Sequence, residues 1–216
     1  MVYCVLLLSV ISTLTTTSFS LSCVQCQDAT DVPCTGKTAP CPSSADICVS
    51  KYTETFIAGL LFSKLYMRNC GDRATCSVSS SMTTSHGRVI TSSTCCYTEG
   101  CSPPRPVLPP VNFKKNGVVC KTCHAMQSQP CDSDTYTDCL GNETKCLSQV
   151  STVAGLTSTA MRGCATPSLC AIPHEEGSLE HLRFISDTTC TDGGAGLHYC
   201  LYLLGVTFIG LFKVMY

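Results

Sequence analysis

Residues 23–48 read CVQCQDATDVPCTGKTAPCPSSADIC, and residues 120–146 read CKTCHAMQSQPCDSDTYTDCLGNETKC. Each stretch holds five cysteines, separated by two, seven, six and six residues in the first and by two, seven, seven and six in the second. Three further cysteines continue the correspondence, so eight cysteines recur in the same order from Cys23 and from Cys120. Self-similarity of this kind predicts two copies of one small module, each framed by disulfides.

The cysteine content places the chain among the disulfide scaffolds of an oxidising compartment. The 216 residues include 20 cysteines and no tryptophan, and neither module has enough large apolar residues for a deep core. The formal net charge is −1, but residues 120–190 carry four basic and eight acidic groups. That balance would suit a cationic partner, but an ordinary solvated surface is the favoured interpretation. No basic stripe is present, so we expect no nucleic-acid partner.

The N-terminal segment, residues 1–20, has the pattern of a secretory signal peptide. An apolar run over residues 5–11 gives way to serine and threonine, and the small residues Ser18 and Ser20 precede Leu21. We expect cleavage at this point, which removes Cys4 from the mature protein.

The C-terminal segment, residues 192–216, has the pattern of a glycosylphosphatidylinositol (GPI) attachment signal. Small residues precede an apolar tail, and Gly193 is the expected attachment residue. The alternative is a transmembrane helix over residues 197–212, but this run is short for a bilayer and no basic tail follows it. Removing both ends, with Cys4 and Cys200, leaves an even count of 18 cysteines, enough for nine bridges.

Residues 102–118 separate the two modules and contain five prolines. This composition favours a stiff, extended polyproline II spacer. A ligand for an SH3 domain is the alternative interpretation, but such ligands are bound in the cytosol and this segment is expected outside the cell.

Both modules are predicted to be all-β, because no segment shows a sustained apolar period of 3.6 residues. In the first module, residues 49–69 place strand-forming residues on both sides of Gly59, as a long hairpin requires. In the second, residues 147–163 centre a similar run on Gly155.

The cysteine order, which ends in the adjacent Cys95 and Cys96 followed by Cys101, resembles that of the urokinase-receptor/Ly-6 family. Domains of that family have the three-finger fold of snake toxins, so the resemblance implies two such domains in tandem, over residues 21–101 and 119–191. It also implies nine disulfides: Cys23–Cys48, Cys26–Cys34, Cys41–Cys70, Cys76–Cys95, Cys96–Cys101, Cys120–Cys146, Cys123–Cys131, Cys139–Cys164 and Cys170–Cys190.

The second module departs from the family pattern in one bridge. Thr191 and Gly196 stand where the ninth and tenth cysteines are expected, so both partners are missing together. The asparagine that follows the last cysteine in the family is also absent, since Ser102 follows Cys101 and Leu197 follows Gly196. The ends of both modules are therefore expected to differ from those of the family.

No catalytic, metal or cofactor site is predicted. Cys-x-x-Cys pairs suit zinc or redox chemistry in a cytosolic protein, but in a secreted chain with an even cysteine count they favour structural disulfides. Residues 173–177, PHEEG, lack the His-Glu-x-x-His spacing of a metalloprotease and are expected to form an exposed acidic fingertip. Without a nucleophile motif or a phosphate-binding loop, we expect no enzymatic activity and no cofactor.

The candidate partner-binding residues lie at the expected tip of the middle finger of the first module. They are Phe56, Ile57, Leu60, Leu61 and Phe62. An exposed apolar patch marks an interface. The alternative is that these side chains pack on the adjacent module or on the face of the sheet.

The one N-glycosylation sequon of the chain is Asn142-Glu143-Thr144, between Cys139 and Cys146. A sequon of a secreted chain is commonly on a surface loop. We therefore expect a glycan at Asn142.

Two classes of function fit these features. The first is a GPI-anchored, receptor-like protein on the outer leaflet of the cell membrane, which presents two three-finger domains to an extracellular or cell-surface protein ligand. The second is a secreted phospholipase A2 inhibitor of the gamma type, because two-module inhibitors with a proline-rich junction have a similar layout. The apolar tail favours the first, since those plasma inhibitors lack an anchor signal. In both cases we expect neither a metal nor a nucleic acid as partner.

Overall fold

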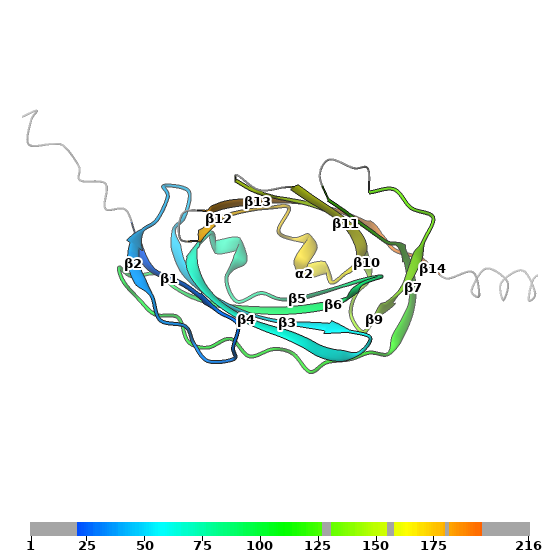
Figure 1. The fold of residues 1–216 in the computed structure, drawn as a ribbon, viewed down its shortest axis with the longest axis horizontal. Coiled ribbons are helices and arrows are strands. Elements are labelled where there is room, and N and C mark those ends of the chain that lie inside the picture. Colours follow the sequence, from blue (N-terminus) through cyan, green and yellow to red (C-terminus); the bar gives the residue numbers. More distant parts are fainter. Residues whose placement is uncertain (1–20, 127–130, 155–157, 180–181, 196–216) are drawn as a thin grey trace, which may run out of the picture.

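The computed structural model describes residues 21–126, 131–154, 158–179 and 182–195, and in these ranges the chain is built almost entirely of β-strands (Figure 1). The first module contributes β1 (Ser22–Asp28), β2 (Lys37–Pro40), β3 (Ile47–Ile57), β4 (Leu60–Gly71), β5 (Ser79–Thr84) and β6 (Gly87–Cys96), with a 3₁₀ turn at Arg73–Thr75. The second contributes β7 (Lys115–Lys121), β8 (Cys123–Met126), β9 (Tyr136–Leu140), β10 (Lys145–Val153), β11 (Ser158–Ala165), β12 (His174–Leu179), β13 (Leu182–Asp192) and β14 (Gly194–Ala195), with one short helix, α2 (Pro167–Cys170). The prediction of an all-β fold is confirmed.

Each finger of the first module is an antiparallel hairpin. β1 pairs with β2, β3 with β4, and β5 with β6. β3 also pairs with β6, which joins the second and third fingers into one sheet, and the end of β1 pairs with β4. Serine and threonine are the commonest residues of these strands, and threonine, like the interspersed valine, isoleucine and tyrosine, suits a half-buried pleated surface.

The second module repeats this topology with its first strand divided in two. β7 pairs with β9 as β1 pairs with β2, while β8 pairs with β11 as the end of β1 pairs with β4. The hairpins β10–β11 and β12–β13 form the second and third fingers, and β10 pairs with β13 to join them. The repeat seen in the cysteine spacing is therefore a repeat of strand pairing.

Nine disulfides pair the cysteines in the combination that the resemblance implies, with Cα–Cα distances from 5.4 to 6.1 Å. The buried clusters of both modules consist largely of these sulfur atoms. A native bridge typically contributes about 2–4 kcal/mol to stability. The bridges therefore offset an apolar core that is too small to hold either module by itself.

The second module lacks the disulfide that corresponds to Cys96–Cys101, and its chain end is held in a different way. Thr191 of β13 faces Cys146 of β10 at the register position that Cys96 holds opposite Cys48 in the first module. In the first module the Cys96–Cys101 bridge then ties down the chain end. In the second, β14 pairs with β7 instead, so backbone hydrogen bonds take over that task.

Strand pairing continues from one module into the other. Thr83 of β5 pairs with Cys164 of β11, and the backbone of the neighbouring Ser81 exchanges hydrogen bonds with Thr166. A Cβ atom on Gly163 would come within 2.2 Å of the Thr83 carbonyl oxygen, so only glycine permits this approach. The result is one sheet of eleven strands that spans both modules.

A buried ion pair lies beside this shared strand pairing. The Nε atom of Arg88, on β6, donates to Oε1 of Glu143 at 2.9 Å, and the side chains are only 7% and 0% exposed. The Ser81 hydroxyl donates to the same carboxylate at 2.7 Å, and the backbone N–H of Leu140 donates to its other oxygen. Arg88 also donates to the carbonyl of Asn112. Glu143 of the second module is therefore bound by side chains of the first module and by its own loop, and Arg88 connects this pair to the linker.

The proline-rich linker is extended but does not span open solvent. Ser50 of β3 donates to the Pro103 carbonyl at 3.4 Å, and the Arg105 guanidinium lies 5.4 Å from the ring centre of Tyr52. Leu108 packs on the cluster around the Cys26–Cys34 bridge. The segment predicted to be a stiff spacer over residues 102–118 is therefore docked along the first module, and β7 already begins at Lys115.

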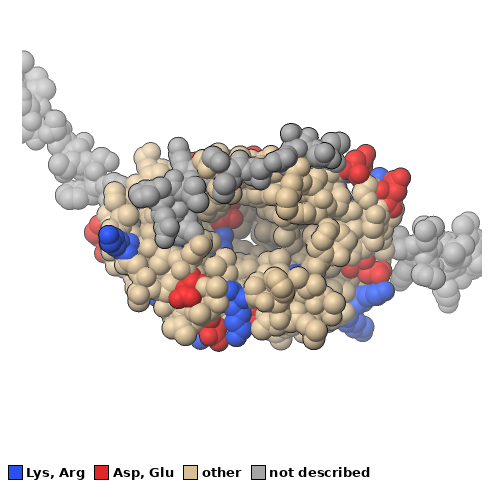
Figure 2. Space-filling view, viewed as in Figure 1, with Lys and Arg blue, Asp and Glu red and all other residues tan. Residues whose placement is uncertain are grey.

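The sheet curls until its far end returns to the first module. β12 packs against β4, and Glu175 of β12 forms an ion pair with Lys51 of β3. Two adjoining hollows, of about 220 and 160 Å³, lie inside this curl and share Lys51, Thr75 and Glu175 in their walls. Figure 1 shows the strands around this space, and Figure 2 shows it as an opening on the same face.

We predict that Glu143→Gln strongly destabilises the protein, because it leaves the buried Arg88 guanidinium without a counter-charge. Breaking a buried pair in this way costs about 3–5 kcal/mol of unfolding free energy. The measurement is denaturant unfolding with all disulfides oxidised. Glutamine keeps the sequence Asn-x-Thr, so the sequon is unchanged.

The matched control is Asp46→Asn, which breaks the exposed pair between Arg73 and Asp46, whose side chains are 71% and 46% exposed. An exposed pair is worth at most about 1 kcal/mol. Equal losses in the two variants would show that Glu143 does not hold the modules together.

Candidate protein-binding surface

The tip of the middle finger is a two-residue turn between β3 and β4. Ala58 and Gly59 have φ angles of 50° and 79°, and Ile57 pairs with Leu60 across the turn. Positive φ at both turn positions matches the twist of the flanking strands and closes the hairpin tightly. The chain therefore presents the residues around the turn at the far end of a long, narrow finger.

Four of the five candidate residues lie on the surface of this tip. Leu60 is 75% exposed, Phe62 is 71%, Leu61 is 47% and Ile57 is 42%. A β-bulge, at which the register passes from Thr55–Ser63 to Phe56–Leu61, leaves Phe62 without an opposite residue. Consecutive side chains then escape strict alternation between the two faces. We call Ile57, Leu60, Leu61 and Phe62 the apolar tip.

Phe56 differs from the other four, because it is only 8% exposed. Its ring meets the ring of Phe113, from the linker, edge to face with centroids 5.6 Å apart. Phe113 in turn lies 5.6 Å from the guanidinium of Arg88. The packing alternative therefore holds for Phe56 alone, and its contact is with the linker rather than with the second module. Phe56 supports the tip and is not part of its surface.

A hollow of about 370 Å³ opens at the root of the tip. Its walls come from four places: Phe56 and Ile57 of the middle finger, His86 of the third finger, Phe113 of the linker and Leu140 of the second module. An apolar side chain of a partner that contacts the tip has a concave place to enter here.

Charged contacts hold the first finger against the middle finger. Lys64 donates to the carboxylate of Asp31 at 3.2 Å, and this hydrogen bond lowers the pKa of Asp31 below its usual range. Nearby, burial raises the pKa of Tyr52 to about 12, and donation of its hydroxyl to Glu54 at 2.9 Å adds to the effect. These contacts lie on the body of the finger, so the tip itself remains apolar.

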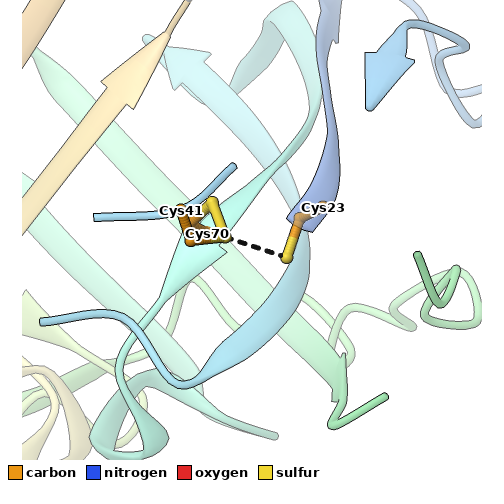
Figure 3. A group of neighbouring side chains, drawn as sticks. All are labelled: Cys23, Cys41 and Cys70. Atoms are coloured by element: carbon orange, nitrogen blue, oxygen red, sulfur yellow. Dashed lines mark hydrogen bonds between the residues drawn. A yellow bond between two sulfur atoms is a disulfide. The ribbon is translucent and has the colours of Figure 1, made fainter. Parts of the chain in front are cut away.

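Three groups of cysteines have sulfur atoms close enough together to suggest a metal site. One consists of Cys23, Cys41 and Cys70, and Figure 3 shows Cys23 beside the Cys41–Cys70 bridge. The sulfur atoms of Cys41 and Cys23 are 3.3 Å apart. Every sulfur in the three groups already belongs to a disulfide, so none supplies the thiolate that zinc binding requires.

The remaining candidate residues lie far from the apolar tip in the sequence. Asn142 and Thr144 are exposed, while Glu143 between them is buried at the module junction. Gly193 packs so closely that an added Cβ atom would come within 2.1 Å of a side-chain carbon of Val118. Residues 1–20 and 196–216, with the expected signal peptide and apolar tail, lie outside the described residues. In the described ranges, no helix has the length and apolarity to cross a bilayer.

The family model of the u-PAR/Ly-6 domain matches this chain twice, over residues 20–104 and 116–195. The chain belongs to the u-PAR/Ly-6 domain family. Each matched segment corresponds to one module of three hairpins (Figure 1), so this u-PAR/Ly-6 protein carries two three-finger domains in tandem.

Curated relatives of this u-PAR/Ly-6 protein are inhibitors and receptors by name. It is 33% identical over 157 residues to the phospholipase A2 inhibitor NAI of Notechis ater, covering 69% of this chain and 78% of the inhibitor. It is 31% identical over 157 residues to a gamma-type phospholipase A2 inhibitor of Laticauda semifasciata, covering 70% of this chain and 85% of the inhibitor. It is 29% identical over 181 residues to the urokinase plasminogen activator surface receptor of Bos taurus, covering 81% of this chain and 53% of the receptor.

We predict opposite effects for two phenylalanines of the same finger. Phe56→Ala should cost about 3–5 kcal/mol of unfolding free energy, because it empties a buried site. Phe62→Ala should change stability by less than about 0.5 kcal/mol, because the side chain is exposed. Denaturant unfolding of both oxidised variants measures this difference. A large loss for Phe62→Ala would mean that the tip is packed against another part of the protein.

Proposed function

We propose that this protein is a cell-surface binding protein, tethered to the outer leaflet by a GPI lipid, which takes an extracellular protein ligand on the apolar tip. The observation that carries the proposal is the exposure of Leu60 and Phe62 on a tip with a tight turn, supported by the packing of Phe56 on Phe113. Exposed apolar side chains on a fixed support lose little entropy on binding, so they suit a hot spot. Catalysis plays no part in this function.

The names of the relatives agree with a binding role. A phospholipase A2 inhibitor and a urokinase plasminogen activator receptor are each defined by a protein partner. We infer that this chain likewise acts by binding a protein, and that it needs no cofactor.

A secreted inhibitor of phospholipase A2 is the second candidate function. The identity of 33% to the inhibitor of Notechis ater, over most of both chains, favours it. The two candidates differ in one physical respect, namely whether the mature protein keeps a lipid.

Attachment at the small residues that begin at Gly193 fits the fold of the second module. Gly194 and Ala195 pair with Val119 and Val118 of β7, and Gly193 donates its N–H to the Thr144 carbonyl at 3.4 Å. Attachment at Gly193 therefore gives up the two pairings of β14, while attachment at Ala195 keeps them. Either choice places the lipid directly at the base of the second module, without a flexible stalk.

We predict that phosphatidylinositol-specific phospholipase C releases the protein from the surface of cells that express the full chain. The released protein is measured in the medium by immunoblotting. A matched variant that ends after Gly196 should be secreted without the enzyme. Full-length protein that enters the medium without the enzyme would overturn the anchor and support the secreted inhibitor.

We predict that Phe62→Ser and Leu60→Ser abolish ligand binding while the protein still reaches the cell surface. The measurement is crosslinking of extracellular proteins to cells that display each variant, with surface amounts matched by antibody staining. Val107→Ser is the control, because Val107 is 82% exposed on the linker and outside the apolar tip. Partners that crosslink equally to all three variants would place the binding site elsewhere.

Inhibition of a purified secreted phospholipase A2 tests the second candidate. If the natural protein inhibits the enzyme and Phe62→Ser does not, the phospholipase is the ligand of the apolar tip. Inhibition that Phe62→Ser leaves unchanged contradicts the role of the tip but not the inhibitor function, so the two parts of the proposal fail separately.

A further inference from the structure

Two histidines from different modules meet at the junction, on the outside of the protein. His86 lies in the two-residue turn of the β5–β6 hairpin, and His124 lies on β8. Their ring centroids are 5.3 Å apart and the ring planes are inclined by 58°. Both side chains are exposed. The two rings line one side of a hollow of about 450 Å³ whose wall also includes Asp132.

Hydrogen bonds and a disulfide hold the two chain segments that carry these histidines beside each other. The proximity of the rings therefore does not depend on the side-chain conformations alone. The N–H of Ser85 donates to the hydroxyl of Thr122 at 2.9 Å, which ties the turn of the first module to the second. Thr122 is 1% exposed, and its hydroxyl donates to the Arg162 carbonyl at 3.1 Å. The disulfide between Cys123 and Cys131 holds the chain next to His124 and Asp132.

One ring nitrogen of His86 has a hydrogen-bond partner, as the second nitrogen of a metal-binding histidine commonly does. Nδ1 of His86 is 3.1 Å from the Ser85 hydroxyl. With Nδ1–H donating to that oxygen, the lone pair of Nε2 is available to a metal ion. No hydrogen bond to the ring of His124 occurs among the described residues, so this ring also has a nitrogen to offer.

The spacing of the rings matches that of two imidazoles on one ion. Zinc–nitrogen bonds of about 2.0–2.1 Å at a tetrahedral angle put the centroids of two ligating rings about 5 Å apart. The charges around the hollow are balanced, because Asp132 lies 3.6 Å from Arg162 and 4.0 Å from Lys121, and Lys121 also pairs with Asp134. Because Arg162 and Lys121 are both paired with carboxylates, their positive charges do not strongly repel a divalent ion in the hollow.

We propose that His86 and His124 bind one divalent transition-metal ion of the zinc class, and that this ion joins the two modules. Water molecules complete the coordination. The ion binds the docked arrangement, in which both rings are present, and not separated modules. It therefore stabilises the junction, by an amount that grows with the logarithm of the free ion concentration once this exceeds the Kd. No metal site was predicted from the sequence. The sequence could not have revealed this one, because the two histidines belong to different modules and form no motif.

Isothermal titration calorimetry with zinc chloride tests the proposal on the secreted variant that ends after Gly196, made without a histidine tag, because this variant keeps every described residue. We expect one zinc per chain, and a loss of affinity greater than about tenfold in His86→Ala and in His124→Ala. Ser85→Ala should weaken binding less than either ligand variant does, because it frees the ring of His86 without removing it. His174→Ala is the control, since this exposed histidine pairs with Asp187 away from the hollow.

A second readout is thermal unfolding, in which zinc should raise the Tm of the natural protein and of His174→Ala but not of the two ligand variants. Mapping of the nine disulfides by mass spectrometry verifies that every variant is folded. The proposal is overturned if the natural protein binds no zinc, or if zinc binding survives His86→Ala or His124→Ala. In those cases the two rings are simply packed against each other.

Discussion

The buried pair of Arg88 and Glu143 is the contact on which the arrangement of the two modules depends. A charge with no exposure is tolerated only with its partner present, so neither module is complete at this surface without the other. Around the pair, the strand pairing of β5 with β11 and the carbonyl of Asn112 bring both modules and the linker to one point. Because Arg88 also touches Phe113, and Phe113 touches Phe56, the same point supports the finger that carries the apolar tip.

The two modules solve the problem of a small core in slightly different ways. Both rely on sulfur atoms packed at the base of the fingers, where a larger domain has leucine and isoleucine. The second module has one bridge fewer, with Thr191 in the place of a cysteine, and a two-residue strand closes its end instead. Loss of a disulfide is thus compatible with the fold when the chain end finds backbone partners.

The sequence predicted the features that depend on spacing and missed those that depend on distant polar residues. Two repeats of eight cysteines indicate the module, the strand content and, through the family resemblance, the nine pairs. Arg88 and Glu143 carry no such signal, because they lie 55 residues apart and look like ordinary surface charges. The apolar tip was visible as a run of apolar residues, but the burial of Phe56 depends on a bulge and on Phe113, which no local pattern reveals. The meeting of His86 and His124 likewise exists only in the docked arrangement.

The docked linker has a mechanical consequence. A pull between the apolar tip and Ala195 passes from one module to the other through the β5–β11 pairing and the Arg88–Glu143 pair. If these contacts yield, the linker is free to peel away from the first module, and polyproline-like chain extends by about 3.1 Å per residue. The undocked linker then lets the two modules move apart under load. This separation relieves the tension before any disulfide-bonded finger has to unfold.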